Sequence, residues 1–189
     1  DNCSFENIGY GLTSYTNDGK AIQIQGSEDF PAKNTHIHHC TFEETKGNGA
    51  VFIMNRVDDF VIEHNTFKNT VWGGINCFNL VSKGGLNRIE RNTFTNIGLG
   101  TPADGDTIAP TSGVGCSAIY CKGDGQTINV QNNYIENCVE NGIEGNYRNV
   151  KYNTIINTGV NSDVRKTPSI EGIYISEANN ELCIIEYNY

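Results

Sequence analysis

The stretch Ile89-Glu90-Arg91-Asn92-Thr93-Phe94-Thr95-Asn96 decides the fold, because its pattern returns along the whole chain. The copies of its last five residues read C-S-F-E-N (3–7), C-T-F-E-E (40–44), N-T-F-K-N (65–69), N-T-F-T-N (92–96), N-Y-I-E-N (133–137) and N-T-I-I-N (153–157). A seventh copy begins at Asn188. Self-similarity of this kind, with copies 20 to 41 residues apart, predicts a solenoid of stacked repeats.

Each repeat contains three short strands. One strand is the x-F-x-N segment itself. A second carries an aliphatic residue three positions before the motif, as Ile89 does before Asn92. The third follows the motif as a small residue and then an aliphatic one, as in Gly74-Ile75-Asn76-Cys77. Alternation with a period of two marks each segment as a strand with one inward face. A spacing of 20 residues is too short for a strand-helix-strand unit that also holds these strands.

Stacking the repeats in parallel aligns like residues about 4.8 Å apart. The aromatic and aliphatic motif residues then form one internal column: Phe5, Phe42, Phe67, Phe94, Ile135 and Ile155. Asn65, Asn92, Asn133, Asn153 and Asn188 form an amide ladder, because an amide both donates and accepts hydrogen bonds. We therefore predict an all-β, right-handed, single-stranded parallel β-helix of about six rungs. We expect residues 1–189 to be one domain and a segment of a longer solenoid.

These repeats resemble the parallel β-helix repeat of the pectin-lyase-like superfamily over essentially the whole chain. That superfamily includes pectate lyases, polygalacturonases, alginate epimerases, inulin fructotransferases and phage tailspikes. The resemblance implies an extracellular, secreted or virion-surface protein. It also implies a polysaccharide cleft on the outer face of the strand that begins with the small residue.

The charge and composition of the chain limit the classes of partner that it is expected to bind. The net charge is −9 and the pI about 4.8, which disfavours nucleic acid and anionic membranes as partners. An acidic protein also repels uronate polymers unless Ca²⁺ or a basic cluster intervenes, so a neutral glycan is favoured. The seven cysteines include no C-x2-C pair, which argues against a zinc ribbon, and we expect most of them to be small apolar fillers.

Loop lengths point to a groove. From the last motif position to the next small residue the chain takes 14, 6, 5, 22, 5 and 15 steps. Long loops therefore follow the motif strands of the first, fourth and sixth rungs, and the two longest are 98–115 and 158–169. We predict that they wall a groove over the outward residues of the adjacent strand. Alternation gives these as Gln23, Phe52, Asn76, Tyr120, Glu144 and Tyr174, then Gln25, Met54, Phe78, Lys122, Asn146 and Ser176, with the small residues also facing outward.

Aromatic rings stack on sugars and amides bond hydroxyls, so we expect Phe52, Asn76, Tyr120, Lys122 and Tyr174 to contact substrate. The alternative is that the alanines and glycines pack under the loops and that the aromatics pack against a protein partner.

Cleavage needs acid–base groups, and glycoside hydrolysis needs two carboxylates. Glu144 is the leading catalytic candidate, because it points outward in the slot between the two tallest loops. Asp104 and Asp106 in the first of these loops, and Glu171 at the start of the last strand, are candidates for a second carboxylate. Each is also compatible with an ordinary solvated acid.

We predict no resident metal or cofactor, although Asp104 and Asp106 have the chemistry to hold Ca²⁺. His36, His38, His39 and His64 lie close together on another strand and its turn. Imidazoles in such a group have the chemistry to bind a metal, but these four face away from the predicted groove.

Two functions remain open. The first is a carbohydrate-active enzyme, of hydrolase or lyase type, that binds and cleaves a polysaccharide in the groove. The alternative is a structural solenoid like a phage tailspike or adhesin, which binds a surface glycan and packs as a homotrimer.

Overall fold

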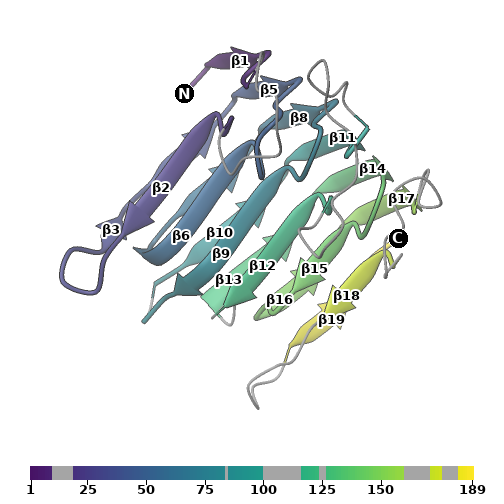
Figure 1. Cartoon of the computed structure of the whole chain (residues 1–189). Helices are drawn as coiled ribbons and strands as arrows, with labels where there is room; N and C mark the ends of the chain where they lie inside the picture. Colours follow the sequence, from purple (N-terminus) through teal and green to yellow (C-terminus); the bar gives the residue numbers. More distant parts are fainter. Residues whose placement is uncertain (10–18, 84, 100–115, 124–126, 160–170, 176–182) are drawn as a thin grey trace.

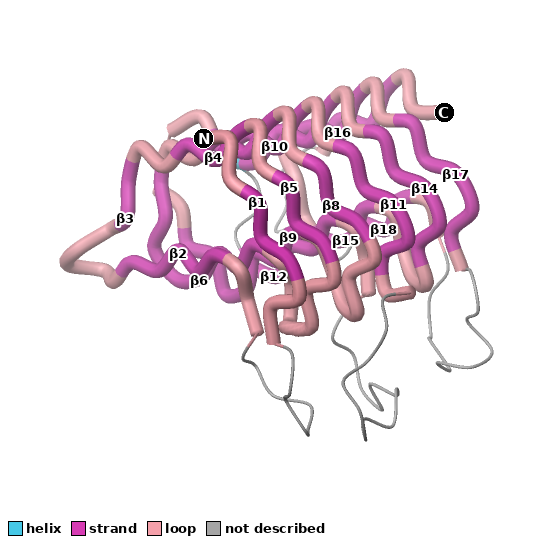
Figure 2. Tube along the Cα trace, turned by 90° about the horizontal axis from the view of Figure 1, so that it is seen from above, coloured by secondary structure: helices cyan, strands magenta, loops and turns pink. Residues whose placement is uncertain are grey.

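The computed structural model describes residues 1–9, 19–83, 85–99, 116–123, 127–159, 171–175 and 183–189. Over these residues the chain is a stack of rungs built from short strands, with its two ends at opposite ends of the stack (Figures 1 and 2). The strands form three sheets, and within each sheet all the pairings are parallel. The predicted parallel β-helix with three strands per rung is confirmed. Among the described residues, no helix has the length and apolar character needed to span a membrane.

Sheet 1 contains the strands that follow the small residue. They are β2 (Ile22–Gly26), β6 (Val51–Asp58), β9 (Ile75–Val81), β12 (Ile119–Gly123), β15 (Ile143–Gly145) and β18 (Ile173–Ile175). The short β3 (Ala32–Lys33) lies off this order and pairs with the end of β6. It extends the first rungs beyond the regular stack (Figure 2).

Sheet 2 contains the strands that precede the motif. They are β4 (His36–His38), β7 (Val61–Glu63), β10 (Asn87–Glu90), β13 (Ile128–Gln131), β16 (Asn149–Lys151) and β19 (Ile184–Glu186). Sheet 3 contains the motif strands. They are β1 (Ser4–Glu6), β5 (Thr41–Glu43), β8 (Thr66–Lys68), β11 (Thr93–Ile97), β14 (Tyr134–Cys138) and β17 (Thr154–Thr158).

The turn from sheet 2 to sheet 3 has the same length in every rung because the same backbone conformation is used each time. Its first residue is left-handed in every rung, with φ between 51 and 57° at Asn2, His39, His64, Arg91, Asn132, Tyr152 and Tyr187. The ladder asparagine that follows caps the bend. In the middle rungs, Asn92 Oδ1 accepts from the Asn65 backbone N–H and from Asn65 Nδ2, each at 3.0 Å, and Asn92 Nδ2 donates to Asn133 Oδ1 at 3.1 Å. The predicted amide ladder is confirmed.

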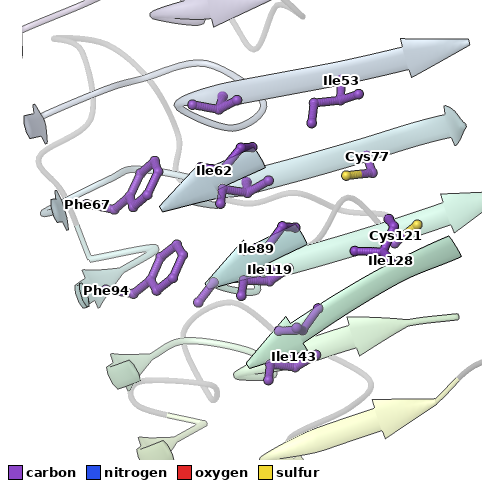
Figure 3. Packing of buried hydrophobic residues seen from close by; sticks show 14 of the residues in the cluster. Ile53, Ile62, Phe67, Cys77, Ile89, Phe94, Ile119, Cys121, Ile128 and Ile143 are labelled. Carbon is purple, nitrogen blue, oxygen red and sulfur yellow. The ribbon is translucent and has the colours of Figure 1, made fainter. Parts of the chain in front are cut away.

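Side chains from all three sheets fill the interior of the stack (Figure 3). Phe5, Phe42, Phe67 and Phe94 stack with ring centroids 5.0, 4.8 and 4.7 Å apart and nearly parallel planes. Ile62 and Ile89 from sheet 2 and Ile53 and Ile119 from sheet 1 meet this column and are fully buried. The cysteines confirm the prediction of apolar fillers: Cys40, Cys77, Cys116, Cys121 and Cys138 are buried, and none of the seven, all of which the structure describes, forms a disulfide.

Candidate functional site

The outward residues of sheet 1 form one continuous row across the rungs, as the alternation predicts. The pairing registers align Gln23 with Phe52, Phe52 with Asn76, Asn76 with Tyr120, Tyr120 with Glu144, and Glu144 with Tyr174. We call this row the site column. Neighbouring members are about one strand spacing, 4.8 Å, apart. Five of the predicted site residues therefore lie side by side over β6, β9, β12, β15 and β18 (Figure 1).

Glu144 is half-buried in the site column, and one of its two carboxylate oxygens is held in place. Oε2 accepts hydrogen bonds from Ser117 Oγ at 2.7 Å and from Asn141 Nδ2 at 3.0 Å. Ser117 and Asn141 are themselves buried, so both donors are fixed. No described residue donates a hydrogen bond to Oε1. The carboxylate is therefore oriented by Ser117 and Asn141 through Oε2.

A second carboxylate, Glu140, lies at the neighbouring turn, and the sequence reasoning missed it. It is only 8 % exposed, and its Oε2 accepts from the Cys116 backbone N–H at 2.6 Å. Cys116 and Ser117 are adjacent, so consecutive residues hold the two acids. The signal was present in the stretch 140–145, E-N-G-I-E-G, but Glu140 precedes the strand and alternation does not assign it a face.

Tyr120 lies beside Glu144 in the site column, and both Glu144 and Glu140 affect the pKa of its hydroxyl. Burial, followed by the negative charges of Glu144 and Glu140, raises the pKa of Tyr120 to about 12. The phenol therefore stays protonated near neutral pH. It can donate one hydrogen bond and accept another from a hydroxylated ligand.

The other predicted site residues lie around this centre in different ways. Tyr174 is 41 % exposed on the far side of Glu144. Lys122 is exposed in the next column, with Nζ 5.7 Å from the centroid of the Phe78 ring. The Glu171 side chain is exposed, and its backbone N–H donates to Asn141 Oδ1 at 2.7 Å, so Asn141 links Glu171 to Glu144. Asp104 and Asp106 lie outside the described residues.

Asn76 and Phe52 belong to the site column but are covered. Phe52 is 5 % exposed, and Lys20 Nζ lies 4.8 Å from its ring centroid. Asn76 is 1 % exposed, and its Nδ2 donates to the Asn48 carbonyl oxygen at 3.1 Å. Asn76 Oδ1 is buried without a hydrogen-bond partner in the described structure. Of the described members of the column, Gln23 at one end and Tyr120, Glu144 and Tyr174 at the other are therefore the ones that are not buried.

The prediction that the small residues face outward is wrong. Ala50 and Ala118 are completely buried. A Cβ added to Gly74 would lie 2.7 Å from the Phe94 ring, and one added to Gly142 would lie 2.7 Å from Ile155 Cγ2. The chain bends at this corner between sheet 3 and sheet 1, so the strand alternation does not extend back to the small position. These residues are small because the internal column approaches them.

This finding predicts opposite outcomes for two equivalent glycines. Gly142→Ala should lower the free energy of unfolding by about 1–3 kcal/mol, since the new methyl would overlap Ile155 and lie 2.8 Å from the Gly172 carbonyl oxygen. Gly172→Ala should be neutral or slightly stabilising, because its nearest contact is Ile155 Cγ2 at 3.9 Å. Urea denaturation of both variants measures the difference. Equal destabilisation would mean that the corner is not packed as described.

The described part of the site column contains no cluster of three His, Cys, Asp or Glu side chains that could together hold a metal ion. Of the described residues, one group of three His, Cys, Asp or Glu side chains lies within metal-binding reach, and it is on sheet 2: Asp1, His38 and His39.

Comparison of the chain with protein-family models, with curated proteins and with solved structures gave no significant match.

Proposed function

We propose that this chain is a carbohydrate-active β-helix protein that binds a polysaccharide across the site column and cleaves it with Glu144. One observation carries the proposal. Glu144 lies between two tyrosines in a row, and one of its carboxylate oxygens is fixed by Ser117 and Asn141, while no residue that the structure describes donates to the other.

The geometry suits a glycan chain in three respects. Tyr120 and Tyr174 are two rungs apart, about 9.6 Å, so their rings can contact separate sugar units on either side of the carboxylate. The protonated Tyr120 hydroxyl and the Glu144 carboxylate supply a donor and an acceptor for sugar hydroxyls. The buried Ser117 and Asn141 limit movement of the acid, as catalysis requires.

The donors around Glu144 also suggest its role. Both Ser117 and Asn141 direct hydrogen bonds to Oε2, so the position of the carboxylate is fixed beside the tyrosines. Glu144 is therefore suited to accept a proton or to attack an anomeric carbon, and Tyr120 is the neighbouring group that carries a proton to give. Glu140 and Glu171 are the described candidates for a second carboxylate in hydrolysis.

The second candidate function is glycan binding without cleavage, in the manner of a tailspike or adhesin. It is favoured by the contacts of the two acids: Glu140 and Glu144 each use one carboxylate oxygen to accept hydrogen bonds from the protein, which suits a structural role as well as a catalytic one. This alternative predicts saturable binding without product, and a homotrimer in sedimentation experiments.

A panel of neutral and acidic polysaccharides tests both functions. Binding is measured by retention on immobilised glycan, hydrolysis by new reducing ends, and elimination by the ultraviolet absorbance of an unsaturated product. For an accepted glycan, we expect Glu144→Gln to lower turnover on the order of a hundredfold, because it removes an acid–base group but keeps its shape. Glu136→Gln, on the outer face of sheet 3 and bonded to Tyr134, is the matched control and should leave turnover unchanged.

Binding is tested with a second matched pair. Tyr174 and Tyr134 are 41 % and 38 % exposed, but only Tyr174 belongs to the site column. Tyr174→Ala should weaken glycan retention and Tyr134→Ala should not. Unchanged turnover in Glu144→Gln contradicts the catalytic assignment. Equal binding by both tyrosine variants contradicts the location of the site, and binding without product by the unaltered chain establishes the second function.

A further inference from the structure

A cluster of imidazole rings covers the first rungs of sheet 2, away from the site column. His36 and His38 face outward on β4, on either side of the buried Ile37. His39 and His64 follow β4 and β7 in the left-handed turn position, with φ of 54 and 55°. This backbone places the ring of His39 against that of His38, although the two residues are consecutive in sequence.

Three side-chain atoms of this region converge on one point. The two Nδ1 atoms of His38 and His39 are 3.0 Å apart, and His38 Nδ1 is 3.5 Å from Asp1 Oδ1. All three ligand atoms lie within 4.8 Å of one another. A tetrahedral zinc ion with ligands at about 2.0–2.1 Å separates neighbouring ligand atoms by roughly 3.3–3.4 Å. The two short separations bracket this value, so an ion can enter with small movements.

The surroundings hold these ligands in place. The ring of His36 stacks on that of His38 at 4.1 Å, and the ring of His64 stacks on that of His39 at 5.1 Å. His36 Nε2 in turn lies 2.9 Å from Glu63 Oε1. Asp1 is positioned by the backbone, because the N–H of Asn2 donates to the His38 carbonyl oxygen at 3.4 Å. Such outer contacts fix the orientation of metal-binding imidazoles.

A hydrogen bond between the two imidazoles accounts for the short distance between the Nδ1 atoms of His38 and His39. It does not account for the position of the Asp1 carboxylate beside them. Two neutral rings in complementary tautomers satisfy each other and need no third group. Asp1 nevertheless points its oxygen at the same nitrogen. Two histidines and one carboxylate whose ligand atoms all lie within 4.8 Å of one another are a ligand set for a divalent transition ion.

We propose that Asp1, His38 and His39 form a binding site for a divalent transition metal ion of the Zn²⁺ class, with one coordination position open to water or to another ligand. The site lies on sheet 2 and is independent of the function proposed for sheet 1.

Zinc titration of the full chain, followed by calorimetry, tests this site. We expect saturable uptake of one Zn²⁺ per chain, and a Co²⁺-loaded sample with the visible spectrum of a low-symmetry, tetrahedral-like site. His39→Asn should lower Zn²⁺ affinity at least about tenfold. Asparagine suits this backbone, since Asn132 occupies the same turn position at φ 56°. Far-ultraviolet circular dichroism confirms that the variant is folded.

His64→Asn is the matched control, because it makes the same change at the same turn position one rung away, where no ligand is proposed. It should reduce affinity less than His39→Asn does. Asp1→Asn should also weaken binding, and it separates a three-ligand site from a simple pair of histidines. The proposal is overturned if uptake is not saturable at one equivalent, if His39→Asn or Asp1→Asn binds as tightly as the unaltered chain, or if His64→Asn is as damaging as His39→Asn.

Discussion

Asn92→Leu should lower the free energy of unfolding by about 3–5 kcal/mol, a large share of the stability of an ordinary domain. Asn92 is 1 % exposed, and its side chain makes four hydrogen bonds. Leucine has similar bulk but leaves the buried Asn65 N–H and the Ile62 carbonyl without partners. Buried polar groups that lose a partner pay the full cost of desolvation. Urea denaturation monitored by circular dichroism measures the loss.

Asn188→Leu is the control for this substitution, since Asn188 is a partly exposed member of the same ladder. Its side chain bonds Asn153 and the Val150 carbonyl oxygen, in a place where water can replace it. We expect a loss below about 1.5 kcal/mol. If Asn92→Leu lowered the free energy of unfolding as little as Asn188→Leu, the ladder would contribute little to stability. The constant length of the turn from rung to rung would then need another cause.

Phe67→Ala should be comparably destabilising, by about 3–5 kcal/mol, for a different reason. Phe67 is fully buried between the rings of Phe42 and Phe94, at centroid distances of 4.8 and 4.7 Å. Alanine would leave a cavity in the middle of the column and remove both ring contacts. Because each rung contacts only its neighbours, a defect here also weakens the coupling between the two halves of the stack. Urea denaturation again gives the change.

Phe67→Ile separates the effect of volume from that of side-chain class. The same column contains Ile135 and Ile155, so the interior accepts isoleucine at this position in other rungs. We expect a loss of about 1–2 kcal/mol, smaller than that of alanine because less space is emptied. An isoleucine variant as unstable as the alanine variant would show that the aromatic stack, rather than the filled volume, holds these rungs together.

The repeat made the fold predictable to the level of register. Phe5, Phe42 and Phe67 pair in the structure as they align in the sequence, because in-register parallel stacking places equivalent residues directly over each other. The excursion from β2 to β3 was not predicted, since it belongs to one rung only and has no second copy to reveal it. A sequence repeat predicts the regular part of a solenoid, but it cannot predict an insertion that occurs in one rung only.

The candidate site was predictable only where it lies on a regular strand. Tyr120, Glu144 and Tyr174 were found by alternation, which fixes the outward face of sheet 1. Glu140 and the inward direction of Gly142 were missed because both residues lie at the corner between sheets, where backbone dihedral angles, rather than strand period, set the direction of a side chain. Ser117 and Asn141, which hold Glu144, occupy the same corner.

Because the asparagine ladder repeats the same contacts, a whole rung can be inserted or deleted without changing the chemistry between the rungs that remain. Asn92 meets Asn133 through the same pair of hydrogen bonds by which Asn133 meets Asn153. Removing the 20 residues from 133 to 152 would bring Asn92 against Asn153 with the same chemistry, and duplicating them would lengthen the stack by about 4.8 Å. Whole-rung insertions and deletions are thus a low-cost route for length variation, and each one shifts the spacing of residues on sheet 1 relative to one another.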